Sequence, residues 1–126
     1  KTFPPESPPS LYFTKIMEAR FGSRAAGNWN SLLRCAIEMA LRANLPSSRL
    51  TAMSIPVVHG QKTDNGYSPL ANEFDMSMQN VDANKAWQLT LRLAKELRTD
   101  VRVRFVWRDK EGAAHPGKEA VMEWKP

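Results

Sequence analysis

The chain has 126 residues, 42% of them hydrophobic, and its 18 lysines and arginines outnumber its 13 aspartates and glutamates for a net charge of +5. This length is typical of one domain, and the apolar content excludes an intrinsically disordered chain. No apolar run approaches the roughly 18 residues of a membrane span, so we expect a soluble protein that does not enter a membrane.

The number of cysteines indicates the redox state of the compartment and limits the possible disulfides and metal sites. Cys35 is the only cysteine, which excludes an internal disulfide and any metal site built from several cysteines. We therefore predict a reducing, cytoplasmic location, with no metal and no other cofactor. Because Cys35 falls within an apolar helical pattern, we interpret it as a buried side chain rather than a nucleophile.

The N-terminal segment differs in composition from the rest of the chain. Residues 1–9 include four prolines, which cannot join a helix interior or the middle of a sheet. We predict an extended arm, and two interpretations stay open: a linker to another domain of a larger protein, or a loose chain end. Residues 10–126 are predicted to form a single α+β domain.

Two helices are predicted to open this domain. Apolar side chains recur at helical spacing over residues 11–21, and Gly22 is a suitable stop signal. A second, longer helix is expected to begin at Asn28 or Asn30, both favourable N-cap residues, and to end before Pro46.

The middle of the chain changes to the alternation typical of strands. Apolar and smaller or polar residues alternate over residues 53–57, and Pro56 places this strand at a sheet edge. Residues 59–69 are rich in turn formers and are predicted to be a loop. A second alternating segment follows at residues 74–78, and we expect the two strands to pair.

The last third predicts a helix followed by a hairpin. Asp82 is a favourable N-cap for an amphipathic helix that ends near Arg98, and alternating strands follow at residues 101–108 and 119–125. The order is α-α-β-β-α-β-β. We predict a two-layer α+β sandwich in which helices cover one face of a four-stranded, mostly antiparallel sheet.

Three residues are candidates for proton transfer or metal binding. His59 and His115 lie in predicted loops, and Asp64 could orient one of them or join a metal site if the two loops meet. The alternative is that both histidines are solvated turn residues. No sequence signature of an enzyme or of a phosphate-binding loop is present, so we favour a noncatalytic domain.

The strand at residues 101–108 places three arginines on one face. Arg102, Arg104 and Arg108 could hold phosphates, because a guanidinium donates paired hydrogen bonds and stays charged. The alternative is ion pairing across the hairpin. Aligning the apolar faces sets Arg104 opposite Glu123 and Arg108 opposite Glu119.

The third predicted helix carries a less balanced basic surface. Lys85, Arg92, Lys95 and Arg98 recur near helical spacing on its outer side. This surface is the better candidate for contact with nucleic acid, against the alternative of an ordinary solvated helix face. If the helix packs on the sheet, its outer side and the strand arginines point away from each other.

Exposed aromatic residues would favour a protein partner instead. We predict that Trp29, near the start of the second helix, and Tyr67, in the long loop, are exposed anchors. The function hypotheses are a binding or regulatory domain for a protein or a nucleic acid, a small enzyme or metal-binding domain, and a structural domain that assembles through the edge strand containing Pro56. No motif is specific enough to indicate a family.

Overall fold

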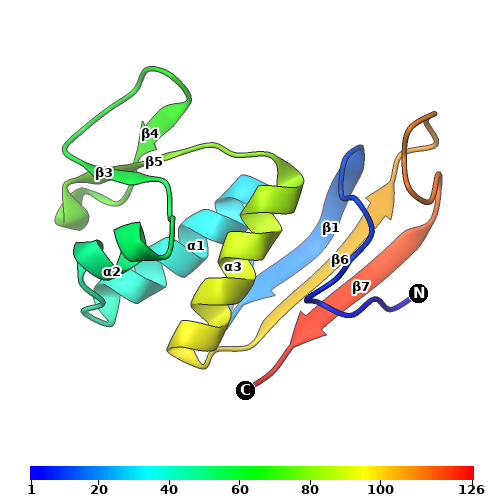
Figure 1. Cartoon of the computed structure of the whole chain (residues 1–126), viewed down its shortest axis with the longest axis horizontal. Coiled ribbons are helices and arrows are strands. Elements are labelled where there is room, and N and C mark those ends of the chain that lie inside the picture. The colour runs from blue at the N-terminus through cyan, green and yellow to red at the C-terminus, as the bar shows by residue number, and fades with distance from the viewer.

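The computed structural model describes all residues 1–126 as three α-helices, one short 3-10 helix and seven strands. The elements are β1 (Thr14–Phe21), β2 (Arg24–Ala26), α1 (Trp29–Arg42), α2 (Ser47–Ala52), β3 (Val57–His59), β4 (Tyr67–Pro69), η1 (Asn72–Phe74), β5 (Met76–Gln79), α3 (Ala83–Leu97), β6 (Val101–Trp107) and β7 (Glu119–Trp124). Figure 1 shows α1 and α3 packed against each other on one side of the sheet that contains β1, β6 and β7. None of the helices has both the length and the apolar content needed to cross a bilayer.

The main sheet has four strands in the order β2-β1-β6-β7, and all neighbouring strands are antiparallel. The inner side of β6 is formed by Val101, Val103, Phe105 and Trp107, which are almost completely buried. These side chains meet the apolar sides of α1 and α3, which contribute a large part of the core. The predicted α+β class, with helices on one face of a four-stranded antiparallel sheet, is confirmed. The membership of the sheet differs from the prediction, because β1 and β2 join the last two strands and the two middle strands belong to a separate sheet.

A second, smaller sheet lies at the other end of the molecule (Figure 1) and has three strands in the order β3-β5-β4. The predicted pairing of the two middle strands is confirmed, since Val57 lies opposite Met78. The edge strand β4 lies within the segment predicted to be a loop, and Ser68 of this strand also lies opposite Met78. The bounds predicted for the first of the two middle strands, residues 53–57, are wrong: β3 covers Val57–His59, and Pro56 lies just before it. The helix α2, which the sequence did not predict, ends at Ala52, and Met53 is its C-cap.

The helix predicted over residues 11–21 is wrong, because this segment forms β1. The buried residues of the strand are Ile16, Ala19 and Phe21. A shift in the pairing with β6 occurs between Ile16 and Glu18, so Met17 is an extra residue at a β-bulge. The bulge lengthens one interval of the two-residue alternation to three residues, and this spacing imitates a helix.

The other two predicted helices are confirmed, together with their caps. Asn28 caps α1 by accepting a hydrogen bond from the Ser31 amide at 2.8 Å. Asp82 caps α3 in the same way, with the Lys85 amide 2.9 Å from its Oδ1 atom. Arg98 ends α3 in the left-handed conformation, with φ of 50°.

The predicted hairpin of the last two strands is confirmed, but its predicted register is wrong by two residues. Glu123 lies opposite Arg102 rather than Arg104, and Glu119 lies opposite Val106 rather than Arg108. A slip of two residues keeps every side chain on its own face of the sheet, so alternation alone does not determine the register.

The N-terminal arm, residues 1–9, lies against the domain. Thr2 forms a parallel bridge with Val121 of β7, and the Phe3 amide donates to the Val121 carbonyl at 3.1 Å. Figure 1 shows the arm, in dark blue, crossing β7 and β6 before the chain enters β1. The arm therefore covers part of the β7 edge, which would otherwise expose unpaired backbone groups.

Candidate functional site

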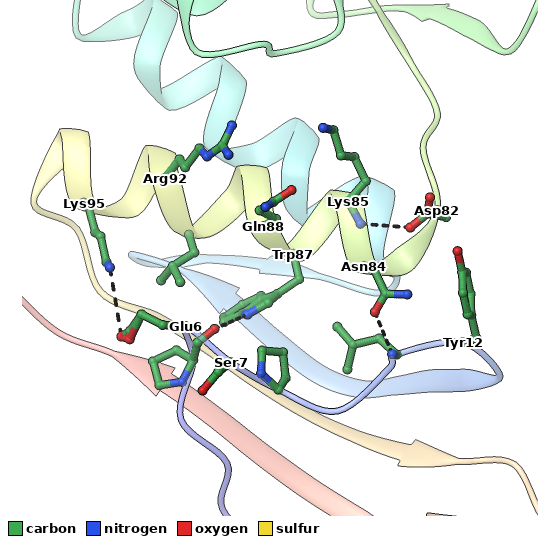
Figure 2. Close-up of a pocket in the computed structure, with 14 residues that line it drawn as sticks. Glu6, Ser7, Tyr12, Asp82, Asn84, Lys85, Trp87, Gln88, Arg92 and Lys95 are labelled. Carbon is green, nitrogen blue, oxygen red and sulfur yellow. Dashed lines mark hydrogen bonds and ion pairs between the residues drawn. The ribbon is translucent and has the colours of Figure 1, made fainter. Parts of the chain in front are cut away.

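A groove of about 570 Å³ lies between the N-terminal arm and α3, and we call it the arm groove. Pro5, Glu6 and Pro8 form part of one wall, and Lys85 and Arg92 lie on the helix side. The volume is within the range typical of ligand-binding clefts. Figure 2 shows Tyr12 at one end of the arm groove and Lys95 at the other.

Two hydrogen bonds between the arm side and α3 set the position of the walls. The indole nitrogen of Trp87 donates to the Pro5 carbonyl at 2.8 Å. The side-chain oxygen of Asn84 accepts from the Leu11 amide at 2.7 Å. Both contacts join residues more than 70 positions apart in sequence, so the groove exists only in the folded chain.

A basic row follows the helix side of the arm groove. Lys85, Gln88, Arg92 and Lys95 are exposed, and their spacing of three and four residues places them on one stripe of α3. Neither Lys85 nor Arg92 is within ion-pair distance of a carboxylate. Figure 2 shows both side chains pointing away from Trp87. Three of the four predicted basic residues of this helix therefore line one groove.

The acidic groups near this row are already engaged. Lys95 lies 4.0 Å from Glu6 of the arm, and Asp82 caps the helix. Arg49 donates two hydrogen bonds to the carboxylate of Glu96, at 2.9 and 3.0 Å. Those hydrogen bonds and the guanidinium charge lower the pKa of Glu96, so its carboxylate stays ionised and paired.

The strand arginines lie on the other side of the sheet and have acidic partners. Arg102 is 3.9 Å from both Glu18 and Glu123, and Arg104 is 3.0 Å from Glu119. This arrangement agrees with the ion-pairing interpretation, although the partners differ from those of the predicted register. Because these pairs are exposed, each contributes about 0–1 kcal/mol to stability.

Two more of the predicted phosphate-binding arginines lie outside the arm groove. Arg98 is exposed at the end of α3, and Arg108 is exposed just after β6. Neither forms an ion pair. The structure therefore divides the seven predicted basic residues into a groove set of three, a paired set of two on the sheet, and two separate positions.

Tyr12 is the residue of the arm groove that sequence reasoning missed. Its side chain is 51% exposed, and its ring forms no contact with another aromatic ring or a cation. The residue was assigned to the apolar side of a helix that does not form. The neighbouring prolines are the one signal that could have indicated an exposed aromatic beside an extended arm.

The structure does not bring the proton-transfer candidates together. His59 is exposed at the end of β3 in the smaller sheet, whereas His115 lies in the loop between β6 and β7. Figure 1 shows these segments at opposite ends of the long axis. Asp64 pairs instead with Lys62 at 2.9 Å, and this contact lowers the pKa of Asp64. The condition for a joint site, that the two loops meet, is not met.

The predicted exposure of Trp29 is wrong. The residue is only 7% exposed because its ring packs on Trp87 and Phe105, and its indole nitrogen donates to the Thr14 hydroxyl at 3.0 Å. Tyr67 is half-buried in β4, with the Lys62 ammonium 5.2 Å from its ring centre.

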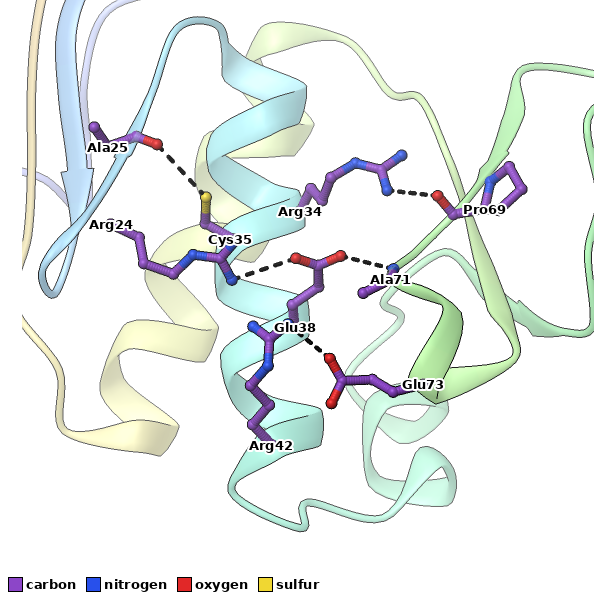
Figure 3. Close-up of polar contacts among 9 residues, drawn as sticks. All are labelled: Arg24, Ala25, Arg34, Cys35, Glu38, Arg42, Pro69, Ala71 and Glu73. Carbon is purple, nitrogen blue, oxygen red and sulfur yellow. Dashed lines mark hydrogen bonds and ion pairs between the residues drawn. The ribbon is translucent and has the colours of Figure 1, made fainter.

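A polar cluster on α1 joins the main sheet to the smaller one (Figure 3). The buried Glu38 carboxylate lies 3.3 Å from Arg24 of β2 and accepts a hydrogen bond from the Ala71 amide at 3.0 Å. Arg34, one turn earlier, donates to the Pro69 carbonyl at 2.7 Å. Beside this cluster, burial raises the pKa of the Cys35 thiol, so the reactive thiolate form is disfavoured.

Comparisons with known proteins do not assign the chain to a family. No protein-family model matches the sequence. No curated protein and no solved structure matches it significantly.

Proposed function

We propose that this chain is a noncatalytic binding domain that docks a nucleic acid along the arm groove. The observation that carries the proposal is the basic row of Lys85, Arg92 and Lys95 along one wall of that groove. Phosphate contacts from lysine and arginine supply most of the nonspecific affinity of proteins for nucleic acids.

The state of the other basic residues supports this choice of surface. Arg102 and Arg104 already have carboxylate partners, whereas Lys85 and Arg92 have none. Arg92 donates only to the Met53 carbonyl, at 3.3 Å. Arg98 and Arg108 also lack ion pairs, but they lie outside the groove, so the groove set is the one that groups unpaired charges along a cleft. A protein partner is less well supported, because the proposed anchor Trp29 is buried in the core and Tyr67 is partly covered.

A noncatalytic role is proposed because the candidate catalytic groups are dispersed. His59 ends β3 and His115 lies in the loop between β6 and β7, two segments at opposite ends of the molecule, and Cys35 is a buried thiol. The proposed location is the cytoplasm, where a free cysteine is stable in its reduced form.

The proposal is tested by fluorescence anisotropy with labelled single-stranded and double-stranded DNA and RNA at low and near-physiological salt. Replacing Lys85, Arg92 and Lys95 together with glutamate is expected to weaken binding at least tenfold. If the wild-type protein contacts three phosphates, the logarithm of its affinity for a single strand should fall with the logarithm of salt concentration with a slope of about −2.

A matched control separates the arm groove from the net charge. Replacing Lys15, Lys118 and Lys125 with glutamate changes the net charge equally but at exposed positions outside the groove. We expect this control to retain most of the affinity. Equal losses in the two variants, or no saturable binding at near-physiological salt, would exclude the arm groove as the nucleic-acid site.

A further inference from the structure

We infer that the ligand of the arm groove is a single strand, with one base stacked on Tyr12 and the backbone following Lys85, Arg92 and Lys95. The inference rests on the proposed function, because it specifies which form of nucleic acid the groove accepts. It depends on two independent features of the fold: the surroundings of α3 and the exposure of Tyr12.

The surroundings of α3 are unfavourable for reading a duplex. A helix with its side chains is about 10–12 Å across, and the major groove of B-DNA is about 12 Å wide, so the side of a recognition helix that enters the groove must be free of flanking elements. α3 packs against α1 along one flank. On another side, the arm is attached to it through the Trp87–Pro5 hydrogen bond. A single strand has no such requirement, because it can lie in the groove between the helix and the arm.

Tyr12 has the properties of a stacking platform. Its ring is half-exposed and has no aromatic or cationic partner. The backbone around it is fixed, because the Leu11 amide is bonded to Asn84 and the Phe13 carbonyl accepts from the Arg108 amide at 2.8 Å. Unpaired bases stack on such rings with little sequence preference, whereas the bases of a duplex are already stacked on one another.

The positions of the basic residues along α3 indicate the path that a strand would follow. Tyr12 and Lys95 mark the two ends of the arm groove, and Lys85 and Arg92 follow α3 between them (Figure 2). Lys85 and Lys95 are ten residues apart on the helix, which corresponds to about 15 Å along its axis. This length suits a few nucleotides of single strand, close to the smallest site sizes of known single-strand binders.

Glu6 is the one acidic group of the arm that competes for this path. Its carboxylate lies 4.0 Å from Lys95, where the inference places a phosphate. Replacing Glu6 with glutamine removes the competing charge, so we expect affinity for a single strand to rise by a few fold. Glu111→Gln, in the exposed loop after β6, is the matched control with the same change in charge and is expected to leave affinity nearly unchanged.

The deciding experiment is anisotropy with a labelled deoxythymidine strand of about 12 nucleotides, free and annealed to its deoxyadenosine complement. We expect the free strand to bind at least tenfold more tightly than the duplex. Tyr12→Ala should weaken binding of the free strand about tenfold, whereas Tyr12→Phe should retain it because phenylalanine keeps the stacking face. Circular dichroism checks that each variant is folded.

The possible outcomes separate the inference from the proposed function. Equal affinity for strand and duplex, or full affinity in Tyr12→Ala, overturns the inference, while loss of binding in the triple glutamate variant still supports the proposed function. Absence of binding to both probes overturns both. If Glu6→Gln binds the single strand no more tightly than the wild type does, the strand does not pass Lys95, and this result also contradicts the inference.

Discussion

Replacing Trp107 with alanine is expected to lower the free energy of unfolding by about 3–5 kcal/mol, the range measured for large aromatic residues removed from cores. Trp107 is 1% exposed, and its ring centre lies 5.1 Å from Phe105 and 4.9 Å from His115. Its indole nitrogen also donates to the Ser10 carbonyl at 2.9 Å. The substitution removes core packing together with an anchor at the junction of the arm and the domain.

Urea denaturation followed by circular dichroism measures the effect, and Trp107→Phe separates its two parts. Phenylalanine keeps most of the apolar contact but has no donor for the Ser10 carbonyl, so we expect a smaller loss of about 1–2 kcal/mol. Because domains of this size are stable by only about 5–15 kcal/mol, the alanine variant should be partly unfolded at moderate temperature. A loss below about 1 kcal/mol in Trp107→Ala would contradict a central packing role for Trp107.

Local signals explain the parts of the fold that the sequence predicted correctly. The caps Asn28 and Asp82 lie directly before long amphipathic segments, and each forms the expected hydrogen bond within three residues of itself. Buried residues alternate with more exposed ones along the whole of β6, so the sequence pattern was enough to identify its buried side. These features depend on near neighbours in the sequence, which is why one sequence is enough to find them.

The errors arise where structure depends on distant residues. The bulge at Met17 is visible only in the pairing of β1 with β6, and without it the spacing of buried residues resembles a helix. The edge strand β4 is only three residues long and forms through its pairing with β5. The position of Glu123 opposite Arg102 depends on the conformation of the loop between β6 and β7, and alternation carries no information about it.

The sequence predicted only part of the candidate site, because one wall depends on local spacing and the other on distant residues. The basic residues of α3 share a helix, so helical spacing was enough to group Lys85, Arg92 and Lys95. The opposite wall comes from the arm, whose position depends on the contact between Pro5 and Trp87, 82 residues apart. Helical spacing therefore identified the charges of the arm groove, but it did not indicate the groove itself or Tyr12 at its end.

A buried carboxylate of α1 contributes to the connection between the two sheets, beside the hydrogen bond from Arg34 to the Pro69 carbonyl. Glu38 contacts Arg24 of the main sheet through one oxygen and the Ala71 amide through the other. Ala71 immediately precedes η1 and the central strand β5 of the smaller sheet. A single side chain therefore joins β2, α1 and the segment that leads into the smaller sheet (Figure 3).

We expect Glu38→Ala to lower the free energy of unfolding by about 1–3 kcal/mol, the cost of leaving a partly buried donor without its acceptor. The larger penalty for an isolated buried charge applies only in part, because the Arg24 side chain as a whole is 39% exposed, although its Nη1 atom, which faces Glu38, is buried. Hydrogen exchange at the Ala71 amide should become faster by a larger factor than exchange in α3, since the loss is local.

Glu73→Gln is the matched control for this prediction. Glu73 pairs with Arg42 at 3.0 Å on the same side of α1, but both side chains are exposed. An exposed pair contributes about 0–1 kcal/mol, so this variant should retain nearly wild-type stability and Ala71 exchange. If Glu38→Ala were no more destabilising than Glu73→Gln, the smaller sheet would be held by its apolar contacts, among them Met76 and Met78 in the shared core, rather than by the buried carboxylate.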